Sequence, residues 1–360
     1  MNLSVKIGAV IVAVIAISVS AAAQKKLEID PQTQWEHPHS QIVVPTELAG
    51  LPRTDATEFA PDYLNVSFAY QRPDSPDYIS LYIYRNTNGG VPVWFEQARR
   101  SIESRNVYAN PTLHSDIAPY NWPTQPNWIG LRAFYDTPDS TQSASTGIAL
   151  FSIDGWYVKI RATSNTRSAP DLSLLVDDAL RGIVLPAAQI RQTAPVPVSQ
   201  CAKELEFKKK AKDAKVDGGS ALINALLGSV TLDETKESDA EMASGEDPVT
   251  WCRDSKLGGN QVVYRADGSE NSFLIALGDS GMAVSVGPDL GAALLGPASG
   301  SSKKKYSITV ITDNRRINYV PQNRLPSYNR VMEIINADRV VSSSTTWGKD
   351  TSVTLDPNSL

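Results

Sequence analysis

Short segments of alternating side-chain type, each bounded by turn residues, are the feature that most limits how this chain can fold. The clearest is ISLYIYR at residues 79–85, which ends at the turn sequence NTNGG of residues 86–90. A period of two sends successive side chains to opposite faces of a β-strand. The pair Asp154-Gly155 lies between two further segments of this kind and favours a tight antiparallel hairpin. We therefore expect antiparallel β-sheet.

Amphipathic helices interrupt the predicted strands of the first half of the chain. Residues 91–104 space their large apolar side chains three and four positions apart, and Pro92 suits the first helical turn. Residues 171–183 follow the same period, and Asp171 is a suitable N-cap. This order of elements predicts a sheet with helices packed against it. The other strands predicted in this half span residues 65–70, 128–135, 147–153 and 156–163.

The second half of the chain carries weaker signals. We expect a charged helix at residues 203–215, a short apolar helix at 222–227 and a further helix at 326–337. Residues 287–302 are rich in Gly, Ala and Ser, and we expect them to lack regular structure. Strands are predicted at residues 261–265, 272–277, 282–286, 306–312 and 316–320.

The first 23 residues have the pattern of a secretory signal peptide. Lys6 precedes the apolar run of residues 7–19, and Ala21-Ala22-Ala23 supplies a cleavage site of small residues. The alternative is a retained membrane anchor, although residues 7–23 fall short of the roughly 20 apolar residues that span a bilayer. We expect an exported protein, periplasmic or extracellular, that meets membranes only through this export signal.

The two cysteines, Cys201 and Cys252, suit an oxidising compartment. They do not form a Cys-x-x-Cys pair, which disfavours a redox or catalytic thiol. We predict a disulfide between them, closing a loop within the second half of the chain.

Composition shifts and proline-containing stretches divide the chain into successive parts. The predicted fold class is α+β: an antiparallel sheet with flanking helices, followed by a second, disulfide-linked α+β region. The parts are a signal peptide (1–23), an extended N-terminal arm (24–50), a first α/β domain (51–187), a Pro-containing linker (188–200), a second α+β region (201–341) and a weakly ordered tail (342–360).

The first domain resembles the PsbP-like α/β sandwich, and the chain is similar to uncharacterised exported bacterial proteins. The resemblance implies an antiparallel sheet with helices packed against it. It also implies an accessory or binding role in a membrane-facing compartment, with no catalytic residues to carry over. The segments that carry it are ISLYIYR (79–85), VPVWFEQARRSIES (91–104), GWYVKIRATS (155–164) and DLSLLVDDALRGI (171–183).

Two motifs resemble catalytic or metal sites. Gly278-Asp279-Ser280-Gly281 resembles the nucleophile loop of trypsin-like proteases, but no histidine follows His114, so we expect a turn. His37 and His39 are weak candidates for metal ligands, although a flexible segment does not make a preorganised site. We therefore expect no metal and no cofactor.

Two lysine triplets, at residues 208–210 and 303–305, are interpreted as solvated surface. The alternative is contact with anionic lipid head groups or nucleic acid.

The best candidate for a binding surface lies on two of the predicted strands. Lys159 and Arg161 share one face of a strand, Tyr82 and Tyr84 share a face of another, and Arg85 ends that second strand. Aromatic and cationic side chains together suit a small anionic ligand or a protein partner. The alternative is the solvent face of an ordinary antiparallel sheet.

Composition narrows the function further. The chain has 34 Lys and Arg against 39 Asp and Glu, a net charge of −5, and so lacks the positive field of a nucleic-acid-binding protein. Because we recognise no catalytic constellation, we favour a non-enzymatic exported binding or interaction protein of the cell envelope or periplasm. Its partner would be an envelope protein or a small anionic ligand. A secreted hydrolase whose site is not visible in sequence and a membrane-tethered structural protein remain alternatives.

Overall fold

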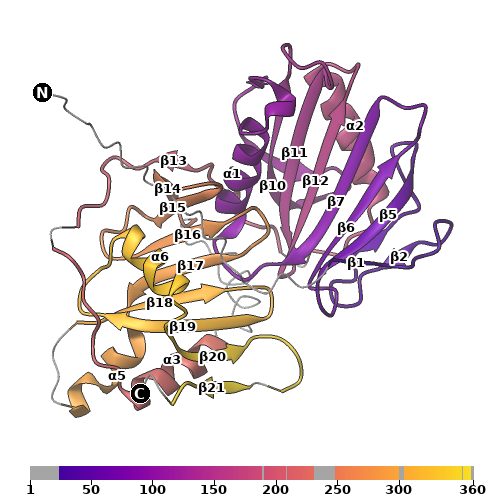
Figure 1. Cartoon of the computed structure of the whole chain (residues 1–360). Coiled ribbons are helices and arrows are strands. Elements are labelled where there is room, and N and C mark those ends of the chain that lie inside the picture. Colours follow the sequence, from indigo (N-terminus) through magenta and orange to yellow (C-terminus); the bar gives the residue numbers. More distant parts are fainter. Residues whose placement is uncertain are drawn as a thin grey trace, which may run out of the picture.

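Two large, mainly antiparallel sheets, each with helices packed on it, dominate the computed structural model (Figure 1). The structure describes residues 24–188, 190–207, 209–230, 248–299, 304–350 and 352–357. The predicted α+β class is therefore confirmed. The predicted signal peptide, residues 1–23, lies outside the described residues. Within the described part of the chain, no helix is long and apolar enough to cross a membrane.

The first unit is built on a ten-stranded antiparallel sheet with the order β1-β5-β6-β7-β12-β11-β10-β8. β4 pairs with β5 and β9 with β10, while β2 (Trp35–Glu36) and β3 (Val43–Val44) form a separate two-stranded sheet. The strands of the large sheet are β1 (Lys25–Lys26), β4 (Glu47–Leu48), β5 (Leu51–Ala60), β6 (Asn65–Gln71), β7 (Asp77–Arg85), β8 (Thr112–Leu113), β9 (Pro119–Trp122), β10 (Gln125–Asp136), β11 (Ser145–Ile153) and β12 (Trp156–Ser164).

Local sequence accounts for the central hairpin of this sheet. Asp154 and Gly155 both have positive φ, 45° and 81°, as a two-residue type I′ turn requires. The turn sets the register of β11 against β12, in which Ile153 lies opposite Trp156. The predicted hairpin is therefore confirmed.

Two helices cover opposite faces of the first sheet. α1 (Gly90–Glu103) packs with Leu150 and Tyr157, whereas α2 (Ala169–Gly182) packs with Phe151 and Val158 from the other side. The N-cap of α2 is Ser168 and not Asp171, because the Ser168 hydroxyl accepts a hydrogen bond from the Asp171 N–H. A short 3₁₀ turn, η1 (Asn106–Tyr108), follows α1.

The N-terminal arm, predicted only as an extended segment, packs against the first unit. Leu27, Ile42, Val44 and Leu48 are all buried in the core between the first sheet and α2. β1 also adds to the edge of the sheet by pairing with β5. The reason is that the apolar side chains of the arm complete a face of the sheet that α2 alone leaves open.

The second unit is a nine-stranded meander in which neighbours in sequence are neighbours in space. Only the first pair, β13 with β14, is parallel. The strands are β13 (Ser199–Gln200), β14 (Trp251–Lys256), β15 (Gln261–Ala266), β16 (Phe273–Leu277), β17 (Ala283–Pro288), β18 (Tyr306–Ile311), β19 (Arg315–Gln322), β20 (Val340–Thr345) and β21 (Val353–Leu355). Its helices are α3 (Gly218–Val230), α5 (Leu290–Ser299) and α6 (Tyr328–Asn336).

Three expectations for the second half were wrong. Residues 203–215 are not helical where described, because Leu205 and Phe207 pack in extended chain against the core around α6. Residues 290–299 form α5 instead of irregular chain. The C-terminal tail adds β21 to the sheet edge and continues the strand order. In each case tertiary contacts override the local composition.

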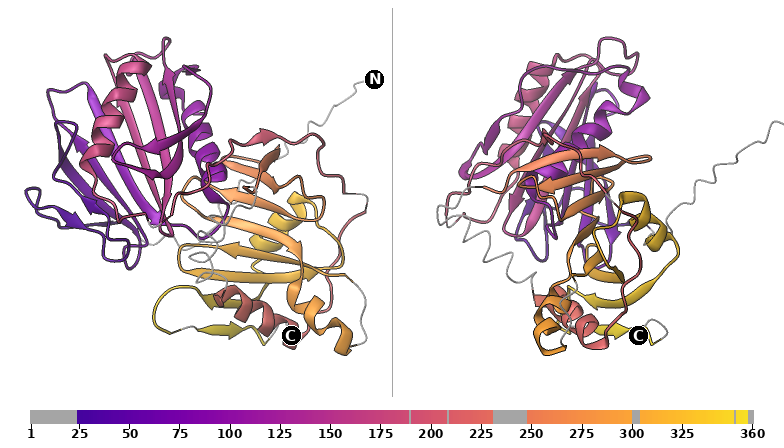
Figure 2. Two further views of the ribbon diagram at one scale, coloured as in Figure 1. Left: turned by 180° about the vertical axis from the view of Figure 1, so that it is seen from behind. Right: turned by 90° about the vertical axis from the view of Figure 1, so that its left-hand side faces the viewer.

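Helix α1 lies between the two sheets and joins the units into one core (Figure 2). Trp94 and Phe95 of α1 are buried together with Tyr157 of the first sheet and with Tyr264 and Leu274 of the second. The Tyr264 hydroxyl donates to the Gln97 side chain of α1, and the Gln97 amide donates to the carbonyl oxygens of residues 260 and 278. The two units therefore share a packed interface as well as a connecting segment.

Candidate functional site

The predicted binding residues lie on β7 and β12, which are antiparallel neighbours. Lys159 lies opposite Tyr82 and Arg161 opposite Ser80, so Tyr82, Tyr84, Lys159 and Arg161 share one face of the sheet. Arg85 follows Tyr84 directly, so its side chain lies on the opposite face of the sheet. The shared face is the one that carries α1.

The second unit covers the middle of this face, which we expected to be open for a ligand or partner. Lys159 is only 3% exposed. Its Nζ donates to the carbonyl oxygen of Asp279 at 2.8 Å and to Asp279 Oδ2 at 3.1 Å. The same Nζ lies 4.8 Å from the ring centroid of Tyr82 and 5.2 Å from that of Tyr84. At Lys159, the predicted surface is thus covered by another part of the same chain.

The Gly278–Gly281 segment supplies that contact. It is a turn between β16 and β17, as predicted: Gly278 and Gly281 have φ of 89° and 91°, and the Leu277 N–H donates to the carbonyl of Met282. The Asn88 amide donates to the carbonyl of Gly281 at 2.7 Å. The Gly-Asp-Ser-Gly sequence therefore forms a turn, and this turn docks the second sheet on the first.

Charges at this contact are unbalanced toward positive. The Lys159 ammonium is the main reason that the pKa of Asp279 is lowered, and Arg161 and Arg105 lower it further. Burial lowers the pKa of Lys159, Asp279 opposes that shift, and the positive charges of Arg161 and Arg105 add to it. Three cations therefore act on one carboxylate within this part of the described structure.

Arg161 has one buried hydrogen-bond donor that the described residues leave without an acceptor. Its Nη2 is buried and has no hydrogen-bond partner among the described residues. The side chain as a whole is partly exposed. A buried guanidinium N–H without an acceptor costs free energy that an anionic acceptor would recover.

Two tyrosines, Tyr82 and Tyr108, are near enough for the charge of this guanidinium to act on them. Burial raises the pKa of Tyr82, and Arg161 counteracts that rise. Burial would also raise the pKa of Tyr108, but hydrogen bonds with Thr146 and Thr163 and the charges of Arg161 and Arg105 lower it instead. We call Tyr82, Arg105, Tyr108, Arg161 and Asp279 the Arg161 site. Arg105, Tyr108 and Asp279 were not predicted, since they join β7 and β12 only through the tertiary fold.

Arg85 belongs to a different contact between the units. Its Nη1 donates to the carbonyl of Asp313 at 2.9 Å and to the Thr346 hydroxyl at 3.1 Å, and its guanidinium lies 4.8 Å from the ring centroid of Trp347. The Trp347 indole in turn donates to Asp62 of the first unit. Arg85 is therefore used in joining the two units, and we exclude it from the Arg161 site.

The two histidines proposed as weak metal ligands are also used structurally. His37 is fully buried; its Nε2 lies 2.9 Å from the Tyr63 carbonyl oxygen, and its Nδ1 accepts from the Ser40 N–H at 3.1 Å. His39 Nε2 lies 3.0 Å from the carbonyl oxygen of Asp62. Among the described residues, no group of three or more His, Cys, Asp or Glu side chains is placed to hold a metal. The expectation of a flexible segment was wrong at His37.

His37 makes stability depend on pH. Burial lowers its pKa from 6.5 to about 4, so the unfolded chain takes up the proton first as pH falls. The free energy of unfolding is expected to decrease through this window, by about 2 kcal/mol between about pH 8 and about pH 5. Urea titrations at the two pH values measure the change. His37→Gln should abolish this decrease in the free energy of unfolding, whereas His114→Gln, at an exposed histidine, should retain it. A decrease of equal size in both variants would contradict the assignment to His37.

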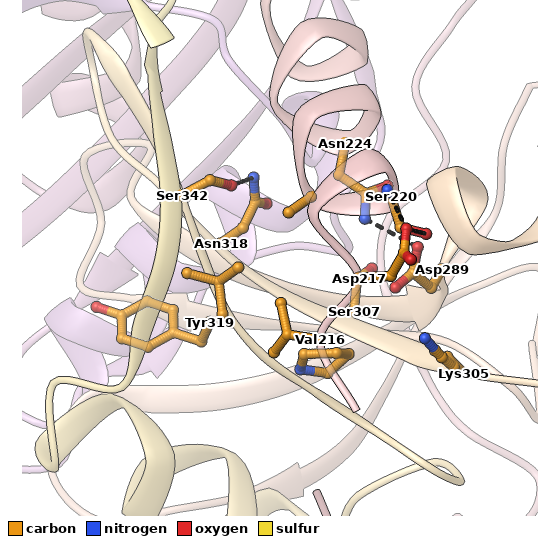
Figure 3. Close-up of a pocket in the computed structure, with 13 residues that line it drawn as sticks. Val216, Asp217, Ser220, Asn224, Asp289, Lys305, Ser307, Asn318, Tyr319 and Ser342 are labelled. Atoms are coloured by element: carbon orange, nitrogen blue, oxygen red, sulfur yellow. Dashed lines mark hydrogen bonds between the residues drawn. The ribbon is translucent and has the colours of Figure 1, made fainter. Parts of the chain in front are cut away.

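A small polar cavity lies under α3 in the second unit (Figure 3). Its volume is about 20 Å³, which is room for about one water molecule. Asp217 and Asp289, which line it, already cap helices: Asp217 accepts from the Ser220 N–H, and Asp289 accepts from the Ala292 N–H and the Asn224 amide. The cavity is too small for an organic ligand, and it is therefore not an alternative to the Arg161 site as a binding site.

The predicted disulfide is confirmed: Cys201 and Cys252 are bonded, across a sequence separation of 51 residues. Comparison of the chain with family models, with characterised proteins and with solved structures found no significant match. The functional argument therefore rests on the geometry described above.

Proposed function

We propose that this chain is an exported, non-enzymatic binding protein of the cell envelope or periplasm that holds a small anion at the Arg161 site. Export is supported by the signal-peptide pattern of residues 1–23 and by the disulfide, which is typical of oxidising compartments. The relationship to PsbP-like proteins is part of the same proposal. It is supported by the element order of the first unit, in which α1 follows β7 and α2 follows β12.

The buried Nη2 of Arg161, without a protein acceptor, is the observation that carries the binding proposal. An anion with at least two oxygen atoms matches the planar fork of a guanidinium. Because residue 161 is partly exposed, we expect a rotation of its side chain to present Nη2 to a ligand. Arg105 adds positive charge, and Tyr82 and Tyr108 add phenolic groups that donate to oxyanions. Asp279 is held by Lys159, which leaves Arg161 for the ligand.

Calorimetric titration with phosphate, sulfate and succinate tests this function. Arg161→Gln is expected to weaken the binding of the preferred anion by about tenfold to a hundredfold, the range for losing a charged hydrogen bond. Arg191→Gln is the matched control, because Arg191 is exposed and lies on the connecting segment. Near-ultraviolet circular dichroism shows whether each variant keeps its fold. Binding that survives unchanged in Arg161→Gln, or no binding of any of the three anions, contradicts the proposal.

A further inference from the structure

Two helices at the end of the second unit that is remote from the first sheet lack a polar face. α3 (GGSALINALLGSV) and α5 (LGAALLGPAS) contain no charged residue, and Figures 1 and 2 show them side by side at that end. A helix on the surface of a soluble protein normally carries charged or polar residues on its outer side. These two helices therefore present an outer surface that water does not favour.

Leucines occupy the outer sides of both helices. Leu222 and Leu226, one turn apart on α3, are 41% and 47% exposed. Leu290 and Leu294, one turn apart on α5, are 62% and 64% exposed. Four of the exposed large apolar side chains of the described chain are thus gathered on two short, contacting helices. Such a concentration marks an interaction surface.

Contacts between the helices hold this surface together. The Asn224 amide of α3 donates to Asp289 Oδ1 at 2.8 Å, and the Gly291 N–H of α5 donates to Asn224 Oδ1 at 2.8 Å. A Cβ at Gly291 would lie 2.5 Å from the carbonyl oxygen of Ser220, so only glycine permits this approach. The pair is therefore a built element in which each helix fixes the position of the other.

Lysines lie at the N-terminal ends of these helices. The Asp289 N–H, directly before Leu290, donates to the carbonyl of Lys305, and Lys305 Nζ donates to the carbonyl of Lys215. Figure 3 shows Lys305 beside Asp289 and Asp217. Both carboxylates are engaged in capping, and Lys304 and Lys215 are exposed. Residues 231–247, which follow α3 in the sequence, lie outside the described residues.

We propose that the α3–α5 surface docks on an anionic lipid surface, with the four leucines among the acyl chains and Lys215, Lys304 and Lys305 at the head groups. Apolar side chains bordered by lysines are the combination that binds at the interface of anionic bilayers. The charges favour lipid, because anionic head groups would supply opposite charges to the exposed Lys215 and Lys304. This membrane contact departs from the expectation of contact through the export signal alone, and it does not depend on the Arg161 site.

A local fluorescence label tests this docking in the full chain. The described residues contain no free cysteine, so Leu226→Cys or Leu294→Cys introduces a thiol for an environment-sensitive dye. Leu174→Cys is the matched control: Leu174 is 66% exposed against 64% for Leu294, but it lies on α2 of the first unit. The probes are vesicles of phosphatidylcholine alone and vesicles of equal parts phosphatidylcholine and phosphatidylglycerol.

A blue shift is expected for the labels on α3 and α5 with the anionic vesicles, and little shift for the label on α2. Lys304→Gln with Lys305→Gln should weaken the response by at least about fivefold, the effect of one lysine at an anionic surface, and added salt should act in the same direction. No shift at either helix, or an equal shift at Leu174→Cys, overturns the proposal. A shift without vesicles that accompanies a doubled mass also overturns it and assigns the surface to a second copy of the chain.

Discussion

Removal of the disulfide between Cys201 and Cys252 is expected to lower the free energy of unfolding by about 4 kcal/mol, because the bond closes a loop of 51 residues. The bond ties the chain that enters the second unit to β14. Beside it, Ser199 pairs in parallel with Cys252, and the Cys201 N–H donates to the carbonyl of Arg253. This short parallel pair is the edge of the sheet, so we expect it to depend on the covalent link. Urea unfolding of Cys201→Ala with Cys252→Ala, compared with the oxidised wild type, measures the loss.

The wild type treated with reductant is the control for this experiment. It should match the double variant, because both lack the same bond and differ only by two sulfur atoms. A loss below about 1 kcal/mol in both would show that the non-covalent contacts of the segment already restrict the unfolded chain, contrary to the loop-closure argument.

Asp279→Asn is expected to destabilise the protein by about 3 kcal/mol, because it leaves the buried Lys159 ammonium without its carboxylate. Breaking a buried ion pair typically costs about 3–5 kcal/mol, and we take the lower end since the Asp279 side chain is 32% exposed. Lys159 keeps the Asp279 carbonyl and the two tyrosine rings as partners. Chemical denaturation near neutral pH measures the change.

Two further variants isolate the charge effect. Lys159→Met with Asp279→Asn should recover most of the loss, since it removes both charges. Asp74→Asn breaks the exposed Arg72–Asp74 pair and should change stability by less than about 0.5 kcal/mol. A double variant no more stable than Asp279→Asn would refute the explanation.

The direction of the pH effect follows from the pKa of Asp279. That pKa is lowered from 3.8 chiefly by Lys159, so the stabilisation from the pair is present above the ordinary pKa. It is lost as pH falls through the lowered value. His37 acts at higher pH, between 6.5 and about 4, and the two contributions are therefore separable in an acid titration.

Part of the candidate site could be predicted because strand pairing follows from alternation. Tyr82 and Tyr84 share a face through their spacing of two, and so do Lys159 and Arg161. Alternation does not show what covers a face. The same pattern is compatible with solvent, with a ligand or with the docking of another sheet, and the turn at Asp279 lies more than a hundred residues away from Lys159.

The elements that sequence alone determined are those whose cause is local. The Asp154-Gly155 turn needs only residues that tolerate positive φ, the helix of residues 91–104 needs only its apolar period, and the disulfide needs two cysteines in an oxidising compartment. Each of these signals is complete within a short segment or a residue pair, and each appears in the structure as expected.

The tertiary structure decided which segments of the chain are buried and stabilised by that burial. The N-terminal arm is ordered because the first sheet has an apolar face for Ile42 and Leu48 to cover. Residues 290–299 are helical through contacts with α3, and Lys159 is buried because the second unit brings a carboxylate to it. Burial depends on surfaces assembled from distant parts of the chain, and therefore no local pattern specifies it.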